Sequence, residues 1–254
     1  MLLRCVVFVA ALAVSLCVPR SLIRKDAANE LVDPCLDGLA IHKEELRKEG
    51  FDIPPNGQHL AMEGTEGGSS EMEFQHLARA AEEAKGGTIC QTGLNYGTSA
   101  YAFLCGEATT RVYSFDIGDH AYVPFAHKIL QKVFPGRHDL VIGDSLNTLG
   151  AVVTKGSLEC DLAFVDGGHS YDVAKADLDN FIKILRPGSL ILIDDCYQEG
   201  DPPGLRGWHI DIGRAFRETL AAGSLITEPS YAIALDSYRS ICAARVPPAI
   251  GAGL

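Results

Sequence analysis

Apolar and polar residues alternate with two different periods between residues 70 and 246, and these periods predict strands joined by helices. A first helix is predicted over 70–87, where Ser70 and Glu73 form the capping-box pattern of a helix start. Short apolar runs predict the strands, at residues 88–92, 111–116, 138–144, 161–166, 189–194, 231–236 and 240–246. Further helices are predicted between them, at residues 98–108, 122–134, 170–185 and 212–223.

Strands that alternate with helices favour a parallel sheet that is covered on both faces. We therefore expect an α/β fold over residues 70–254, with a Rossmann-like, doubly wound and mostly parallel sheet of seven strands. Residues 21–69 are mixed in charge and interrupted by Pro and Gly. We expect an N-terminal extension or cap there, with one short helix over 41–50.

Residues 1–20 have a different composition from the rest of the chain. An apolar run from Cys5 to Val18 follows Arg4, and it is shorter than the ~20 residues that span a bilayer. This pattern is typical of a secretory signal peptide, with an uncleaved membrane anchor or a buried helix as the alternatives. We expect the protein in the secretory pathway, either in the lumen of the endoplasmic reticulum or Golgi or secreted, or tethered to a membrane if the segment is retained.

Six cysteines lie outside this segment, and none of them has the spacing of a metal finger or a CxxC motif: Cys35, Cys90, Cys105, Cys160, Cys196 and Cys242. A secretory route permits disulfides between them. Otherwise they would serve as small apolar residues of the core. The sequence leaves both arrangements open.

The charge balance narrows the class of partner. The chain has 22 basic and 33 acidic residues, a net charge of −11. Nucleic-acid binding depends on Lys and Arg that displace counterions from phosphates, so we expect no nucleic-acid partner. A cationic ligand remains compatible with this charge, and the oligomeric state stays open, a homo-oligomer included.

Four of the predicted strands end on an aspartate: Asp116, Asp144, Asp166 and Asp194. One such residue would be explained as a helix cap, but four at equivalent ends are not. Ligands of open α/β sheets bind outside the carboxyl ends of the strands. The aspartates therefore predict an acidic rim around a ligand-binding crevice.

The first strand-to-helix turn carries glycines at Gly93 and Gly97, which allow the backbone to approach a ligand. Asp116 follows at the end of the next strand, where a carboxylate can accept the hydroxyls of a ribose. Asp144 and Ser145 follow the third strand, where the edge of an adenine would lie. The pattern predicts a cofactor that contains a nucleoside, and the G-x-x-x-G spacing fits a dinucleotide poorly.

These motifs resemble the class I S-adenosylmethionine-dependent methyltransferases, and more closely the branch of the macrocin and mycinamicin sugar O-methyltransferases. Catechol O-methyltransferase is a more distant relative. The resemblance covers roughly residues 70–246 and rests on four stretches, ICQTGLNYGTSAYAFL, VYSFDIG, VIGDSLNTL and DLAFVDGGHSYDVAKADLDNFIKILRPGSLILIDD. It implies that the cofactor binds to Gln91, Gly93, Asn95, Gly97, Ser99, Asp116, Asp144, Ser145 and Asp166. The family usually has an acid at the position of Gln91, so this chain lacks a charge there.

The ends of the fourth and fifth strands carry Asp166, Asp194 and Asp195. Neighbouring strands lie about 4.8 Å apart, so three carboxylates at their ends would repel one another without a cation. Oxygen ligands favour Mg²⁺, with Mn²⁺ or Ca²⁺ as alternatives, and the resemblance implies the same three metal ligands. In the alternative, Asp195 points away and caps the next segment.

His169 follows Asp166 by three residues, and Ser170 is expected to cap the next helix. This places the imidazole beside the crevice, where its unperturbed pKa near 6.5 suits a general base. The resemblance implies that role. The Gly- and Pro-rich segment beyond Asp195 is expected to overhang the acceptor, with contacts from Tyr171, Tyr197, Arg206, Trp208 and His209.

The sequence therefore predicts a divalent-metal-assisted O-methyltransferase that acts on a hydroxyl of a small molecule such as a sugar, a polyol or a catechol-like compound. A nicotinamide-dependent oxidoreductase on the same kind of sheet is one alternative. A secreted methyltransferase-like domain without activity is another, and Gln91 is the feature that favours it.

Overall fold

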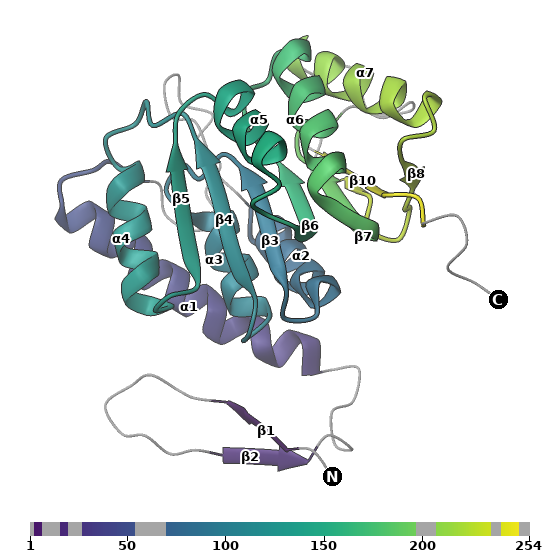
Figure 1. Ribbon diagram of the computed structural model, residues 1–254. Helices are drawn as coiled ribbons and strands as arrows, with labels where there is room; N and C mark the ends of the chain where they lie inside the picture. The colour runs from purple at the N-terminus through teal and green to yellow at the C-terminus, as the bar shows by residue number, and fades with distance from the viewer. Residues whose placement is uncertain are drawn as a thin grey trace.

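The computed structural model describes residues 3–6, 16–19, 27–53, 70–196, 207–234 and 240–248. Its central sheet has the strand order β5-β4-β3-β6-β7-β10-β8 (Figure 1). The strands are β3 (Thr88–Thr92), β4 (Arg111–Asp116), β5 (His138–Ile142), β6 (Cys160–Val165), β7 (Leu185–Ile193), β8 (Ile226–Thr227), β9 (Ile233–Ala234) and β10 (Ser240–Arg245). β3 to β7 are mutually parallel, and β10 is antiparallel to β7. The predicted doubly wound α/β fold is confirmed.

The described sheet has eight strands where the sequence predicted seven, and it differs from the prediction at the edge beyond β7. Of the expected strand at 231–236, Ile233 and Ala234 form β9, which pairs with β10 beside the main strand order. Ile226 and Thr227 form the edge strand β8 instead. Two residues carry too little apolar pattern to be recognised as a strand.

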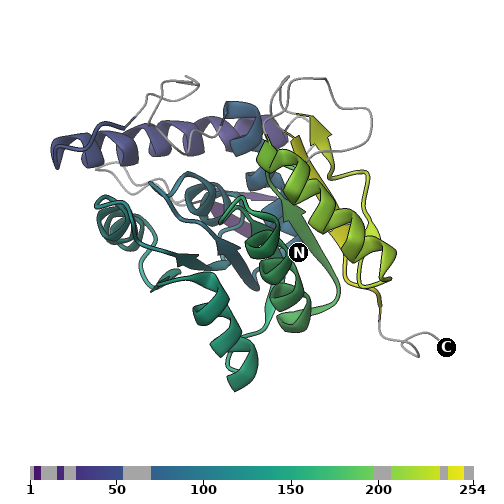
Figure 2. The same ribbon diagram turned by 90° about the horizontal axis from the view of Figure 1, so that it is seen from above.

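Helices cover both faces of the sheet, as expected (Figure 2). α1 (Ala27–Lys48), α2 (Glu71–Ala80), α3 (Thr98–Gly106) and α4 (Val123–Val133) lie on one side. α5 (Ser145–Lys155), α6 (Tyr171–Ile184) and α7 (Gly207–Ala221) lie on the other. A capping box explains the start of α2, where Ser70 and Glu73 bond reciprocally. A single side-chain cap explains the start of α6, where Ser170 Oγ accepts from Val173 N.

The sequence did not predict α5. Only Leu149 among its side chains is buried, so the helix lacks the apolar stripe by which helices are recognised. α6 also ends earlier than expected. Arg186, Pro187 and Gly188 are the second to fourth residues of β7 and not the end of the helix.

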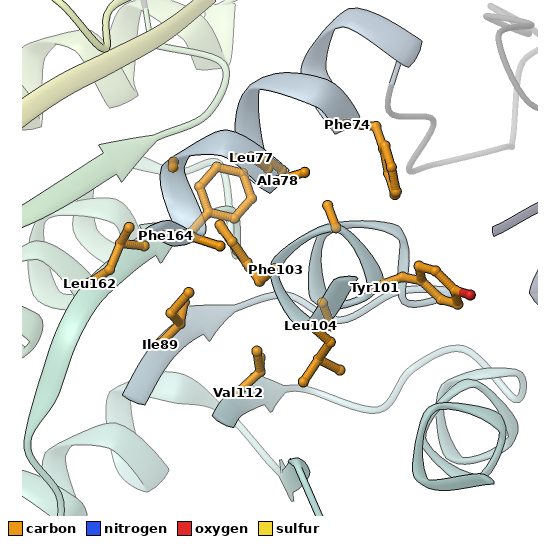
Figure 3. Close-up of a cluster of buried hydrophobic side chains, with 14 of the residues drawn as sticks. Phe74, Leu77, Ala78, Ile89, Tyr101, Phe103, Leu104, Val112, Leu162 and Phe164 are labelled. Carbon is orange, nitrogen blue, oxygen red and sulfur yellow. The ribbon is translucent and has the colours of Figure 1, made fainter. Parts of the chain in front are cut away.

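Strand residues alternate between two separate cores because successive side chains point to opposite faces. In β6, Leu162 and Phe164 pack with α2 and α3, whereas Ala163 and Val165 pack toward α6 and α7. Figure 3 shows Phe164 beside Phe103 of α3, with ring centroids 5.9 Å apart. The burial of both strand faces is what a parallel core sheet requires.

The N-terminal region contains a longer helix than expected. α1 has 22 residues and includes Pro34, where the sequence predicted a short helix over 41–50. Further toward the N-terminus, β1 (Leu3–Val6) and β2 (Leu16–Pro19) pair in antiparallel fashion. No helix in the described residues is long and apolar enough to cross a membrane.

Three disulfides join all six cysteines that lie outside residues 1–20. They are Cys35–Cys105, Cys90–Cys160 and Cys196–Cys242. The first joins α1 to α3, the second joins neighbouring strands, and the third joins the residue after Asp195 to β10. Of the two arrangements that the sequence left open, the structure has the disulfide-bonded one.

Candidate active site at the carboxyl ends of the strands

The turn after β3 is held by the carboxylate that ends β4. Asp116 Oδ2 accepts hydrogen bonds from Leu94 N at 2.8 Å and Asn95 N at 3.0 Å, and Oδ1 accepts one from Gly118 N at 2.7 Å. A carboxylate has about four acceptor positions, so about one remains for a ligand hydroxyl. Most of the hydrogen-bonding capacity of Asp116 therefore holds the turn, and about one acceptor position is left for a ribose hydroxyl.

Gly93 is required by the packing of this turn. Its φ is +79°, and a Cβ built on it would lie 1.9 Å from the backbone oxygen of Asp166. The turn after β3 thus lies directly against the turn after β6. Gly97, with φ +89°, begins α3, while Ser99 is buried in that helix's first turn. Asn95 also has a left-handed backbone, and its Oδ1 accepts from Tyr96 N at 2.8 Å.

The expected adenine end of the site has an exposed apolar surface. Ile117, Ile142 and Leu146 have exposed fractions of 59%, 51% and 43% at the ends of β4 and β5 and the start of α5. Asp144 lies between the last two and caps α5 by accepting from Leu146 N at 2.9 Å. The sequence prediction named Asp144 and Ser145 but missed these apolar residues, since single exposed apolar side chains carry no signal in a pattern of burial.

Two buried polar residues lie under the turns. The Gln91 side chain is fully buried, and its Nε2 donates to the backbone oxygen of Gly93 at 2.8 Å. Its Oε1 has no hydrogen-bond partner within the described chain. Asp177 of α6, which the sequence prediction did not include, lies against Gly167. Burial raises the pKa of Asp177 to about 6. Neither of its carboxylate oxygens has a hydrogen-bond partner in the described part of the chain.

Asp194 is a buried carboxyl among other acids. Burial raises its pKa well above the usual range, and the negative charges of Glu73, Asp166 and Asp195 raise it further. Its Oδ1 has no hydrogen-bond partner in the described part of the protein. Asp166 and Asp194 line one open hollow of ≈ 200 Å³ together with His169. The structure thus brings the predicted acids of β6 and β7 together.

Asp195 points to two histidines. His169 Nε2 lies 3.4 Å from its Oδ2, and His209 Nε2 lies 3.3 Å from its Oδ1. Burial on its own would raise the pKa of Asp195, but the contacts from His169 and His209 lower it below the usual range. Asp195 has a left-handed backbone with φ +50°, which turns its side chain toward these partners. The alternative prediction, that Asp195 caps the next segment, concerns residues 197–206, which lie outside the described residues.

The fit of a divalent cation rests on the chemistry of these donors. The unpartnered Oδ1 of Asp194 and the surrounding carboxylates match the oxygen ligands that Mg²⁺ prefers. No three His, Cys, Asp or Glu side chains of the described residues converge at distances that would hold a metal ion. The donor types fit a metal, whereas the contacts of Asp195 connect it to the two histidines.

The predicted acceptor contacts are dispersed. The Tyr171 hydroxyl donates to Glu218 of α7, and Arg214 lies over its ring at 4.3 Å. Trp208 lies in the first turn of α7. His209 is 3% exposed, and its imidazole contacts the Asp195 carboxylate. In this structure it positions Asp195 and does not lie on the exposed surface where an acceptor would bind. Tyr197 and Arg206 lie outside the described residues.

One face of α1 contributes residues to the site that the sequence prediction missed. His42 Nε2 bonds to the backbone oxygen of Tyr96 at 2.7 Å, and the Lys43 Nζ lies 5.5 Å from the centroid of the Tyr96 ring. His42 and Lys43 are both buried. A signal was present in the sequence, because these two polar residues occupy the stripe defined by Leu39 and Leu46.

Comparison with known proteins agrees with this geometry. Residues 90–196 match a protein family described as a methyltransferase domain. No curated protein matches the chain. Similar solved structures include the SAH-bound methyltransferase PaMTH1 of Podospora anserina, with a TM-score of 0.59, 18% identity and coverage of 90% of this chain and 97% of that one.

Two further structures have the same fold. The O-methyltransferase TomG of Streptomyces achromogenes, in complex with SAM, has a TM-score of 0.58, 19% identity and coverage of 89% of this chain and 92% of its own. The O-methyltransferase of Bacillus cereus, in complex with SAH, has a TM-score of 0.57, 18% identity and coverage of 88% and 93%. Residues 90–196 are therefore similar to a methyltransferase domain, and the chain has the fold of these O-methyltransferases.

Proposed function

We propose that this protein transfers a methyl group from S-adenosylmethionine to a hydroxyl of a small molecule, with His169 as the general base. The observation that carries the proposal is a juxtaposition. The turn held by Asp116 packs through Gly93 against the turn that bears Asp166 and leads to His169. A cofactor site and a proton acceptor therefore share one edge of the sheet, as methyl transfer requires.

The residues around the turn suit the parts of this cofactor. Asp116 keeps about one acceptor position for a ribose hydroxyl. Ile117 and Ile142 offer apolar surface for an adenine ring, with Asp144 and Ser145 at its edge. When bound, S-adenosylmethionine would supply a methyl group carried by a positively charged sulfur. An oxygen nucleophile can bond to this methyl carbon, with the sulfur as the leaving group.

His169 and Asp195 perform the proton transfer in this proposal. A proton on His169 Nε2 faces Asp195, so Nδ1 is the basic atom of the ring. Nδ1 would take the proton of the acceptor hydroxyl as its oxygen accepts the methyl group, and the bound cofactor would supply that group and leave as the neutral thioether. Asp195 stabilises the imidazolium that results, and His209 holds the second oxygen of Asp195 in place.

We include a divalent cation, foremost Mg²⁺, in the proposal on the chemistry of its donors. Asp166, Asp194 and Asp195 would hold it, and the unpartnered Oδ1 of Asp194 supports this assignment. When bound, such an ion lowers the pKa of a coordinated hydroxyl. The contact between Asp195 and His169 supports a second route in which the histidine pair acts without metal.

We propose a sugar, a polyol or a catechol-like compound as the acceptor and the secretory pathway as the compartment. The three disulfides support the compartment, because structural disulfides persist in oxidising environments. The macrocin- and mycinamicin-type resemblance of the stretch from Asp161 to Asp195 supports the acceptor class.

Calorimetry and a turnover assay on the full chain test the proposal. We expect S-adenosylmethionine to bind, and a screen of hydroxylated small molecules to yield an acceptor. We then expect His169→Gln to lower turnover by roughly 10²–10⁴-fold, the usual contribution of a general base, while cofactor affinity is kept. The control is His76→Gln, which removes a half-buried imidazole of α2 that contacts the ring of Tyr231, away from the turns of the proposed site.

The outcomes separate the alternatives. Lack of cofactor binding with and without Mg²⁺ contradicts the proposal, and binding of a nicotinamide cofactor instead favours an oxidoreductase. Unchanged turnover in His169→Gln removes this residue as the base. Turnover that is independent of added Mg²⁺ and of a chelator removes the metal and leaves the pair of His169 and Asp195.

A further inference from the structure

Lys43 is a buried cation that no ion pair joins to an acidic side chain of the described residues, and its ammonium group lies over the ring of Tyr96. It lies in α1, is 2% exposed, and is among the largest fully buried side chains of the protein. No hydrogen bond or ion pair joins its ammonium group to another residue in the described part of the chain. Burying an ammonium group without an anionic partner is costly, and a ring contact offsets only part of that cost, so Lys43 needs a further reason in the folded protein.

The position of Lys43 connects it to the cofactor turn. The preceding residue, His42, bonds to the backbone oxygen of Tyr96 in that turn, at 2.7 Å. Lys43 Nζ itself lies 5.5 Å from the centroid of the Tyr96 ring. The disulfide between Cys35 and Cys105 ties the same helix to α3, which begins directly after the turn. α1 is therefore held against the cofactor turn through His42 and Lys43, and against the opposite end of α3 by the disulfide.

The charges around Lys43 do not fully compensate the cost of burying its ammonium group. Burial lowers the pKa of Lys43 to about 8, Arg47 lowers it further, and Glu73 opposes both effects. Glu73 also acts on Asp194, together with Asp166. Lys43 is thus linked electrostatically, through Glu73, to the acids of the site. Glu73 does not serve as its direct partner, because no ion pair joins the two described side chains within 4.0 Å.

On the basis of the proposed function, we propose that Lys43 binds the carboxylate of the amino-acid end of S-adenosylmethionine. With the nucleoside end at Asp116 and Ile142, the amino-acid end extends to the side of the turn that faces Tyr96 and Asp166. Each charged group at this end of the cofactor then lies near protein side chains of opposite charge. The acids Glu73, Asp166 and Asp194 suit the cationic sulfur and ammonium of the cofactor, and Lys43 suits its carboxylate.

This assignment also explains how the chain can have the neutral Gln91 where the resembling family usually has an acid. A neutral Gln91 contributes no charge to the amino-acid end of the cofactor, and its Nε2 is used within the turn to hold Gly93. In this chain the charged recognition comes from the N-terminal helix and not from the end of β3. α1 is then part of the cofactor site and not only a cover of the sheet.

The test compares two cofactors and two variants by calorimetry on the full chain. Decarboxylated S-adenosylmethionine keeps the ammonium and the sulfonium and lacks only the carboxylate. We expect the wild-type protein to bind S-adenosylmethionine roughly ten- to a hundredfold more tightly than the decarboxylated form, the range for a hydrogen bond to a charged group. We expect Lys43→Met to bind both about equally.

Lys48→Met is the matched control, because it removes the same charge from an exposed position of the same helix. It should keep the preference of the wild type. Equal affinity of the wild type for the two cofactors overturns the inference even if Lys43→Met does not fold, and so does a preference that survives in Lys43→Met. Absence of binding by the wild type to either cofactor contradicts the proposed function itself.

Discussion

Glycine at position 93 decides whether the two halves of the site can meet. Its φ of +79° is in the left-handed region, and a Cβ would lie 1.9 Å from the Asp166 oxygen. The turns after β3 and β6 therefore approach each other only because this residue has no side chain.

We expect Gly93→Ala to lower the free energy of unfolding by about 2 kcal/mol or more and to weaken cofactor binding, since strain and overlap add. Gly150→Ala is the control. Gly150 lies inside α5, and a Cβ there meets nothing within 4 Å, so this change should be neutral or stabilise the protein by up to about 1 kcal/mol. Chemical denaturation measures both. Equal effects would show that the close approach is not what Gly93 provides.

The residue scale also shows what sequence reasoning can find. Asp166, Asp194 and His169 follow strands with clear apolar runs, so their common location followed from the order of elements. The contacts of Asp195 with its histidine partners did not follow from the order of elements. His209 reaches it from α7, and no local pattern specifies a contact between residues 195 and 209. The stripe of α1 marks Lys43 as a polar residue among apolar ones, but its position relative to Glu73 depends on how α1 and α2 pack, which no local pattern specifies.

At the scale of elements, the connection between β7 and β10 supports the catalytic turn. Cys196 follows Asp195 directly and is joined to Cys242 of β10 by a disulfide. Its backbone N–H also donates to Ser240 O at 3.1 Å, and Ser240 Oγ donates to Cys196 O at 2.5 Å. Three links therefore fix the position at which the Asp195 side chain leaves the strand.

We expect the double variant Cys196→Ala, Cys242→Ala to lose about 2–4 kcal/mol of stability, as is usual for the removal of a disulfide. We also expect faster hydrogen exchange at residues 194–196 and lower turnover. The double variant Cys90→Ala, Cys160→Ala is the control, because its disulfide joins β3 and β6, which already pair as neighbours. If both variants lost turnover to the same degree, the effect would reflect stability alone.

The elements themselves were predictable to different degrees, for physical reasons. β6 and β7 are apolar on both faces, and this is a strong signal of a central parallel strand. α5 was missed because Leu149 is its single buried residue, and α1 was shortened because Pro34 indicated a break. Where burial is slight or a proline is tolerated, the pattern of apolar residues underestimates the helices.

On the scale of the whole molecule, the buried histidines make stability depend on pH. Burial lowers the pKa of His42 to about 4 and of His138 to about 3. His138 lies between Ser114 Oγ at 2.9 Å and His127 Nδ1 at 2.8 Å, inside the protein. In the unfolded chain a histidine takes up its proton near pH 6.5. The unfolded state therefore binds more protons than the folded state below that pH.

The sign follows directly. Between pH 6.5 and the lowered pKa, each buried histidine reduces the free energy of unfolding by about 1.4 kcal/mol per unit of falling pH. Asp177 acts in the opposite direction, because burial raises its pKa to about 6. The folded state then binds the additional proton between pH 6 and 3.8, and this contribution increases stability as the pH falls.

We expect His138→Gln to flatten the decline in stability between pH 6.5 and 4.5 relative to the wild type, and Asp177→Asn to steepen it below pH 6. Urea denaturation at half-unit steps measures both, and the difference from the wild type cancels the other titrating groups when they are unaffected. Opposite changes from the two variants would assign the acid sensitivity of the molecule to its buried histidines. Parallel slopes in all three proteins would place its origin in the surface carboxylates.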